Sequence, residues 1–334
     1  MISVIIPTLN EQDHIAALLT QLESQTDVTL EIIVADGGST DRTRQIVTDT
    51  KICLVESLPG RGKQMNAGSR SATGEYFLFL HADSRLSHDQ QLSEALAHLS
   101  QYQGVIAGHF PLLFDATDGA VAKGLKFFEA KTRLNRPGTF NGDQGLLIRR
   151  DQFNLLDGFS EKYTFLEDQD FGQRFSKSGR FITLPSPLMT SARRFEQEGF
   201  RERIILNTMI MGMFHLELDR FFEAAPEVYQ ENTSESKLDL SPFFQLVQSV
   251  VFTGGLFTNV RRCYGLGRYA AKNLWQVFLW LGLRRNDTQS SLQNYNRFIE
   301  PMTNNPMGYF LGMMVVLVWF FTTKTWVAIR SGNL

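Results

Sequence analysis

Three short polar turns near the N-terminus carry residues that could do chemistry. Pro7-Thr8-Leu9-Asn10-Glu11 closes the apolar run that begins at Ser3, Asp36-Gly37-Gly38-Ser39 follows EIIVA, and His81-Ala82-Asp83-Ser84 follows YFLFL. A small acidic loop at the end of a buried strand suits a metal, a nucleotide or a phosphoaspartate, or it is a plain turn. The residue types alone leave these alternatives open for the third turn.

The runs between these turns predict the elements that position them. Strands are expected at 3–7, 31–36, 52–57 and 76–83, and helices at 11–24, at 39–47 with Ser39 and Thr40 as caps, and after a glycine-bounded loop within 60–72. Alternating strands and helices with continuously apolar strands are typical of a parallel sheet covered on both faces. Ligands bind at the carboxyl ends of such strands, where the three turns lie.

Composition places the chain among folded proteins. Of its 334 residues, 43% are hydrophobic and 20% are charged, which is ample for a buried core. Two distant cysteines, Cys53 and Cys263, form no disulfide framework or CxxC motif, which fits a reducing compartment and argues against structural zinc. The N-terminus lacks a basic segment and meets Pro7, so we expect no signal peptide.

Charge and hydropathy change together late in the chain. From residue 241 onward there are nine basic and two acidic residues, a net charge of +7, against −9 before it. Segments 241–260, 273–283 and 301–323 contain no charge. We predict a domain at 1–229, a polar linker at 230–240, and a helical, apolar and basic extension at 241–334 that associates with a membrane. A soluble helical subdomain is the alternative, and the choice between a transmembrane and a peripheral segment stays open.

Two further motifs carry charge that chemistry can use. GRGKQMNAG resembles a phosphate loop but has Gln64 where a P-loop needs Ser or Thr, which excludes that kind of ATPase site. Arg61, with Gln64 and Asn66 at the helix start, still suits a diphosphate through charge and N–H groups. LEDQDF places Glu167, Asp168 and Asp170 within four residues, and an acidic helix start is the ordinary alternative.

Seven blocks in a fixed order resemble the family-2 glycosyltransferases of the GT-A fold. They are VIIPTLNE, VADGGSTD, GRGKQMNAG, FLFLHADS, NGDQGLLIRR, FLEDQDFGQR and SARRFE, and they span residues 1 to about 215. The likeness is greatest to the bacterial radical-SAM/selenodomain-associated, or arsenosugar-type, subgroup. The resemblance implies a Rossmann-like half with a mixed, mainly parallel sheet.

The resemblance also implies roles for individual residues. Pro7, Thr8, Glu11, Asp36 and Gly37 would contact the base and ribose of a nucleotide-diphosphate sugar. Asp168 matches the base that deprotonates the acceptor, and Glu167 and Asp170 would cap and orient. Asp143 and Gln144 look like acceptor-side or gating residues, and Arg193 and Arg194 occupy a basic block near the leaving diphosphate.

At the third turn the likeness favours a metal. HADS takes the place of the family's aspartate-rich motif, with Asp83 as its remaining carboxylate and His81 where the usual first aspartate stands. One carboxylate plus diphosphate oxygens and waters suits Mg²⁺ or Mn²⁺. His81 would reach the metal or the nucleotide, or orient Asp83.

The sequence therefore predicts an inverting glycosyltransferase that acts by metal-assisted single displacement on an acceptor hydroxyl or carboxylate. The alternatives are a non-catalytic nucleotide-sugar-binding or membrane-scaffolding protein and, less favoured, a sugar nucleotidyltransferase. We expect a lipid or small-molecule acceptor, no nucleic-acid partner, and a catalytic domain on the cytoplasmic side of the plasma membrane. Donor sugar, nucleotide base and acceptor are not specified by the sequence.

Overall fold

The computed structural model describes residues 1–163, 165–231 and 238–330, and its chain forms two compact units, Met1–Ala192 and Arg193–Leu334. The strands, all in the first unit, are β1 (Ile2–Thr8), β2 (Leu30–Asp36), β3 (Cys53–Glu56), β4 (Tyr76–Phe79), β5 (Ile106–His109), β6 (Leu112–Asp115), β7 (Leu146–Arg149), β8 (Arg180–Thr183) and β9 (Leu188–Ser191). Its helices are α1 (Ile15–Glu23), α2 (Thr43–Thr48), α3 (Arg61–Ser71), α4 (Gln91–Leu99), α5 (Gly119–Lys131), η1 (Gly142–Gln144), α6 (Arg150–Leu155) and α7 (Glu167–Phe175).

Seven strands form one mixed sheet in the order β3-β2-β1-β4-β7-β5-β8. Neighbouring strands are parallel except at β7, which runs antiparallel to both β4 and β5. A separate parallel pair, β6 and β9, completes the unit. The predicted fold class, a mixed and mainly parallel sheet followed by a helical extension, is confirmed.

Both faces of this sheet are buried because alternate strand residues point to opposite sides. Val4 and Ile6 of β1 pack in one core with α1 and α4, whereas Ile5 packs in a second core with α3, α6 and α7. The second core is rich in phenylalanine, and Phe79 lies 4.9 Å, centroid to centroid, from both Phe153 and Phe159. The continuous apolar strands of the sequence are explained by this two-sided burial.

Two helix starts differ from the prediction. Helix α2 begins at Thr43. The Ser39 Oγ accepts the Asn10 N–H and donates to Asp36, and the Thr40 N–H is held by Asn10, so neither residue caps the helix. Helix α3 begins at Arg61, directly after Gly60 at φ 129°, so the motif has no extended loop before it. Arg61 is therefore the first residue of a helix.

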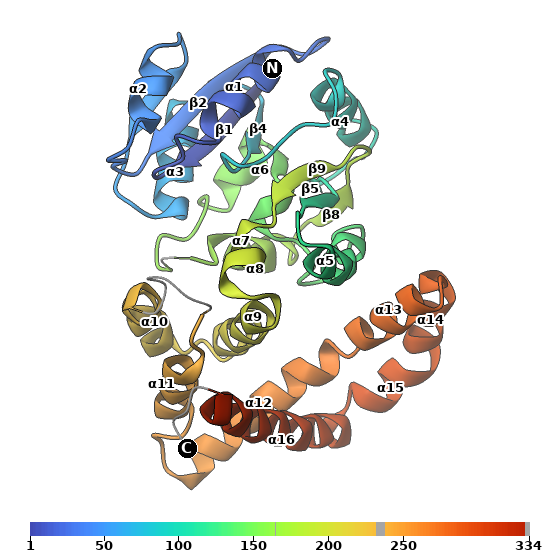
Figure 1. Ribbon diagram of the computed structural model, residues 1–334. Helices are drawn as coiled ribbons and strands as arrows, with labels where there is room; N and C mark the ends of the chain where they lie inside the picture. The colour runs from blue at the N-terminus through green and yellow to red at the C-terminus, as the bar shows by residue number, and fades with distance from the viewer. Residues whose placement is uncertain (164, 232–237, 331–334) are drawn as a thin grey trace. The chain divides into compact units, whose positions relative to one another are not determined.

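The second unit is helical in its described part. Its helices are α8 (Arg193–Glu198), α9 (Phe200–His215), α10 (Asp219–Glu231), α11 (Ser241–Val251), α12 (Leu256–Lys272), α13 (Trp275–Arg284), α14 (Thr288–Asn294), η2 (Tyr295–Ile299), α15 (Glu300–Thr303) and α16 (Pro306–Arg330). Figure 1 shows α12 and α16, in orange and red, lying side by side.

The compact units divide at residue 192, so α8 to α10 belong with the C-terminal helices. Most of the predicted linker, residues 232–237, lies outside the described residues, and the division at 229 and 240 stays a prediction. Within the described chain, α16 is the helix whose length and composition suffice to cross a membrane.

Candidate active site at the strand ends

The sheet topology brings the sequence motifs to one edge. Strands β1 and β2 are parallel and in register, with Thr8 opposite Asp36, and β4 runs parallel beside β1. Their carboxyl ends therefore meet at the same edge. Because β7 is reversed and pairs Leu146 with Phe79, the turn that precedes β7 also lies at this edge. Residues 141–145 are thus placed beside His81.

Asp36 is buried at the end of β2 and organises the turn that follows it. Its Oδ2 accepts the N–H groups of Gly38 and Ser39, both at 2.9 Å, and its Oδ1 accepts the Ser39 hydroxyl at 2.5 Å. The Thr8 hydroxyl donates to the same Oδ1 at 3.3 Å, and the Gly37 N–H donates to the Thr8 carbonyl at 2.9 Å. Asp36 thus fixes the shape of the predicted nucleotide pocket from inside.

The first turn is joined to the second by side chains. Asn10, at φ 57°, accepts the Thr40 N–H at 2.9 Å, and the Glu11 N–H donates to the Thr43 hydroxyl at 2.8 Å. Pro7 is buried within β1. These hydrogen bonds hold Pro7, Thr8 and Glu11, which are predicted to bind the nucleotide, next to Asp36.

Gln64 and Asn66 are buried and use their amides within the protein. Gln64 Nε2 donates to the carbonyls of Thr8 (2.6 Å) and Ala35 (3.0 Å), which holds α3 against β1 and β2. Asn66 Nδ2 donates to the Phe159 carbonyl (2.9 Å), and its Oδ1 accepts the Phe159 N–H (3.0 Å). Both amides therefore position loops beside the site.

A cluster of charge forms where α3 and α7 begin. Burial lowers the pKa of Arg61, but the carboxylates of Glu167, Asp143, Asp168 and Asp83 outweigh it, so the pKa lies above its ordinary value. The approach of α3 to this cluster requires glycine next to Arg61, because a Cβ on Gly62 would lie 2.7 Å from the Ser160 carbonyl oxygen. One cation is thus held facing four acids.

Glu167 is the most deeply buried acid of the cluster. Burial and the neighbouring Asp168 carboxylate raise its pKa, and Arg61 and His81 partly oppose that rise. Its Oε2 is buried and makes no hydrogen bond. A buried carboxyl with one unsatisfied oxygen beside a second carboxylate favours the neutral form, so Glu167 can hold a proton that an exposed glutamate would lose.

Asp168 and His81 are joined through the turn before β7. The Gly142 N–H donates to Asp168 Oδ2 at 2.6 Å, and His81 Nδ1 lies 2.9 Å from Asp143 Oδ1. His81 is nearly buried, with 11% of its side chain exposed, whereas Asp143 is 48% exposed. The proposed base, the histidine and the gating residue therefore belong to one connected set.

Asp83 is near the same cluster, since its carboxylate contributes to the field at Arg61. It makes no hydrogen bond or ion pair within the described part of the chain. The described residues also contain no group of three or more His, Cys, Asp or Glu side chains arranged to hold a metal ion.

The remaining predicted residues lie elsewhere. Asp170 pairs with Arg174 at 2.7 Å, and Arg174 also donates to the carbonyls of Leu156 and Gly158, which braces the loop that Asn66 holds. Arg193 and Arg194 begin α8 in the second unit, and their proximity to a diphosphate stays a prediction.

A buried network behind the η1 turn was not predicted. Gln144 Nε2 donates to His109 Nδ1 at 2.7 Å and to the Thr132 carbonyl at 3.1 Å, while its Oε1 accepts the Asn141 N–H at 2.9 Å. His109 Nε2–H donates to Asn135 Oδ1, and burial lowers the pKa of this histidine, so it is the neutral Nε2–H tautomer. Gln144, which the sequence suggested as a gating residue, holds the turn that carries Asp143. The motif NGDQG was the only signal in the sequence that pointed to this residue.

Comparisons with known proteins place the chain among glycosyltransferases. Residues 3–155 match the family described as Glycosyl transferase family 2. The chain is 28% identical over 194 residues to the PGL/p-HBAD biosynthesis glycosyltransferase of Mycobacterium bovis BCG, covering 55% of this chain and 72% of that protein. It is 33% identical over 109 residues to the poly(ribitol-phosphate) beta-N-acetylglucosaminyltransferase TarS of Staphylococcus aureus, covering 30% of this chain and 19% of TarS.

Two solved structures resemble the chain more distantly. S. aureus TarS 1–349 in complex with UDP is 19% identical, with a TM-score of 0.49, and the match covers 89% of this chain and 91% of that one. The mannosyltransferase PcManGT of Pyrobaculum calidifontis, in complex with GDP-Man and Mn²⁺, is 19% identical, with a TM-score of 0.48 and coverage of 95% and 87%. From the family match and the glycosyltransferase relatives, the chain is a glycosyltransferase, and its residues 3–155 match the family 2 model.

Proposed function

We propose that this enzyme transfers a sugar from a nucleotide-diphosphate sugar to an acceptor hydroxyl or carboxylate with inversion at the anomeric carbon. The observation that carries the proposal is the cluster at the strand ends, where Arg61 faces four carboxylates and Asp168 is held by the Gly142 N–H. The narrower likeness to the radical-SAM/selenodomain-associated subgroup is part of the proposal.

Asp168 is the proposed base. With a hydroxyl acceptor, the acceptor oxygen forms a bond to the anomeric carbon and gives its proton to Asp168, while the bond from that carbon to the nucleoside diphosphate breaks and the diphosphate leaves with the electron pair. A carboxylate acceptor carries no proton and would attack without this transfer. The Gly142 N–H on Oδ2 orients the carboxylate for this transfer. The base and the leaving group act on opposite faces of the anomeric carbon, which accounts for inversion.

Arg61 and the first turn of α3 are the proposed contacts for the departing diphosphate. A cation at a helix N-terminus stabilises negative charge that develops during the reaction. Pro7, Thr8, Glu11, Asp36 and Gly37 would line the base and ribose pocket. Gln64 and Asn66 would position its walls, because their amides are already engaged by backbone groups.

Asp83 is the proposed protein ligand for a divalent cation. Its carboxylate has no hydrogen-bond or ion-pair partner among the described residues, so its oxygens fit Mg²⁺ or Mn²⁺, which prefer oxygen ligands. Such a cation, when bound, neutralises the charge that develops on the diphosphate. Because Asp83 is a lone carboxylate, most of the other ligands would come from the donor and water, and His81 would position the neighbouring turn through Asp143.

The acceptor is proposed to be a lipid or a small molecule, and the enzyme is placed at the cytoplasmic face of a membrane. Support for a membrane location comes from the basic, apolar C-terminal region and the exposed helix α16.

A transfer assay tests the proposal. The purified full chain would be given a panel of nucleotide-diphosphate sugars with Mn²⁺ and candidate acceptors, and the released nucleoside diphosphate and the anomeric configuration of the product would be measured. Asp168→Asn should lower transfer by about 100-fold or more. Asp49→Asn is the control, because Asp49 is an exposed carboxylate at the end of α2, outside the cluster, and its substitution should leave transfer nearly unchanged. Full activity in Asp168→Asn would remove Asp168 as the base.

A further inference from the structure

Helix α16 presents a continuous apolar face that no described part of its unit covers. The exposed positions recur every three or four residues, which places them along one side of the helix. We call this the apolar stripe; it comprises Met307, Phe310, Leu311, Met314, Val315, Val318 and Phe321. Val315 is 66% exposed and Val318 is 60% exposed. An apolar surface of this extent marks a binding or membrane surface.

The opposite face of α16 is packed on the protein along its length. Near its start, Gly312 meets Gly267 of α12 so closely that a Cβ on either residue would lie within 2.4 Å of the other helix's backbone. Further along, the ring of Phe320 lies 5.2 Å from that of Phe244 in α11. At its end, Arg330 Nη1 lies 3.8 Å from Glu202 Oε1 of α9.

The helices packed against α16 carry charge, which opposes a transmembrane position. Arg261, Arg268 and Lys272 are exposed on α12, and the Arg268 guanidinium lies 5.9 Å from the ring centre of Tyr309 in α16. If α16 crossed the bilayer, α12 would be drawn in with it. Each cation at the bilayer centre costs about 2.5–3.5 kcal/mol. A helix that packs one face on charged helices and exposes its apolar face is typical of a helix lying in the plane of the membrane–water interface.

Exposed aromatic rings in this unit are paired with arginines. The guanidinium of Arg284 lies 4.0 Å from the ring centre of Trp280, that of Arg297 5.1 Å from Phe298, and that of Arg330 4.8 Å from Trp326. Aromatic rings settle at the level of lipid headgroups, and an arginine beside each ring can contact a lipid phosphate. The net charge of +7 over residues 241–334 adds attraction to an anionic surface.

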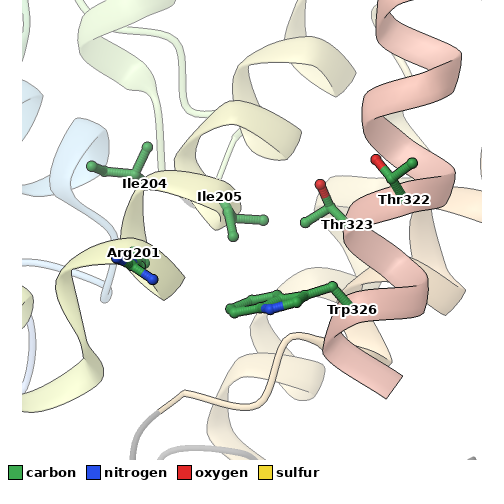
Figure 2. A pocket seen from close by; sticks show the side chains of 6 residues that line it. All are labelled: Arg201, Ile204, Ile205, Thr322, Thr323 and Trp326. Atoms are coloured by element: carbon green, nitrogen blue, oxygen red, sulfur yellow. The ribbon is translucent and has the colours of Figure 1, made fainter. Parts of the chain in front are cut away.

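A cavity beside the end of α16 also suits a lipid. It has a volume of about 450 Å³, and Figure 2 shows its lining side chains converging from α9 and α16: Arg201, Ile204, Ile205, Thr322, Thr323 and Trp326. The cavity is in the size range of small-molecule sites. Apolar walls with one cation fit an anionic amphiphile better than a charged peptide.

We propose that the second unit attaches the enzyme to an anionic lipid bilayer as an in-plane platform, with the apolar stripe of α16 immersed in the interface and α16 not crossing the membrane. The bilayer is chosen over a second copy of the chain because Arg268 lies beside Tyr309 of α16 and residues 241–334 carry a net charge of +7, so two copies would repel each other. The proposal does not depend on the sugar-transfer reaction.

Vesicle flotation tests the attachment. The full chain should float with vesicles of phosphatidylcholine and phosphatidylglycerol, and binding should weaken without phosphatidylglycerol or in high salt. The double variant Val315→Glu/Val318→Glu should lower vesicle affinity by about tenfold or more, because two apolar side chains leave the lipid. Leu155→Glu is the matched control, since Leu155 is an exposed apolar residue of the first unit. Wild-type protein that does not float would overturn the proposal.

Cysteine labelling distinguishes in-plane from transmembrane attachment. In a Cys53→Ser/Cys263→Ala background, single cysteines would be introduced as Asn304→Cys before α16 or appended after Leu334. An impermeant maleimide added outside sealed vesicles should label both positions. If either cysteine is protected until detergent is added, α16 crosses the bilayer and the proposal is wrong. Light scattering of the lipid-free chain gives the third outcome: a dimer that Val315→Glu/Val318→Glu dissociates would assign the stripe to a second copy.

Discussion

The buried carboxyl of Glu167 makes a quantitative prediction about stability and pH. Its folded-state pKa is raised by burial and by Asp168, so the folded protein holds a proton on this group more tightly than the unfolded chain does. The stability associated with that proton is present below the unfolded-state pKa and is lost as pH rises through the folded-state pKa. Glu167→Gln should not lose stability in this pH range, because the glutamine amide stays neutral.

The size of the effect follows from the contacts of Glu167. Its Oε2 is buried without a hydrogen bond, so ionisation places charge on an unsatisfied buried oxygen, which costs about 1–3 kcal/mol more than the neutral carboxyl. Relative to wild type, Glu167→Gln should therefore gain about 1–3 kcal/mol as pH rises from acidic to neutral. In a protein of this size each 1 kcal/mol moves Tm by about 2–4 °C.

Thermal denaturation of both proteins between acidic and slightly alkaline pH measures this difference. Glu23→Gln is the control, because Glu23 is exposed at the end of α1 and its substitution should give a difference that does not vary with pH. The reasoning would be refuted if the Tm difference between wild type and Glu167→Gln were independent of pH, or if Glu167→Gln became relatively less stable as pH rose.

Three further predictions concern the same unit. Asn66→Ala should lower the free energy of unfolding by about 1–3 kcal/mol, because it removes both hydrogen bonds to Phe159. Urea denaturation measures this, and an unchanged midpoint would show that Asn66 does not hold the Phe159 loop. Gly62→Ala should lower both stability and transfer, since its Cβ would meet the Ser160 carbonyl, whereas Ala67→Gly on the same helix should affect mainly stability. Asp143→Asn should weaken the hydrogen bond to His81 and lower kcat, while the free energy of unfolding changes by no more than about 1 kcal/mol. An unchanged kcat would show that the His81–Asp143 pair does not belong to the active site.

Most of the sheet could be predicted from local patterns. The runs that end at Pro7, Ala35 and Leu80 are almost continuously apolar, as strands buried on both faces are, although β4 itself ends at Phe79 and not at Asp83. Their order along the chain then places the polar turns at one edge. Prediction at this level depends on periodicity, which the sequence shows directly.

The pairings across the site could not be predicted in this way. His81 meets Asp143 only because β7 enters the sheet in reverse, and antiparallel insertion leaves no mark in the apolar run LLIR. Ser39 resembles a helix cap in sequence, but its Oγ accepts the N–H of Asn10, from the first turn, and its hydroxyl donates to the buried Asp36 carboxylate. The burial of Glu167 and its raised pKa depend on contacts from α3 and α7 together, which no local pattern specifies.

Donor binding to the strand-end cluster is the central claim, and ligand-induced stabilisation tests it most directly. Thermal denaturation of the full chain would be measured with a panel of nucleotide-diphosphate sugars, with and without Mn²⁺, and compared with Asp83→Asn. We predict that one donor, at about 100 times its Kd and with Mn²⁺ present, raises Tm by about 5–10 °C, and that Asp83→Asn loses the part of the shift that depends on Mn²⁺. No shift with any donor, or a shift that Asp83→Asn leaves intact, would contradict the account.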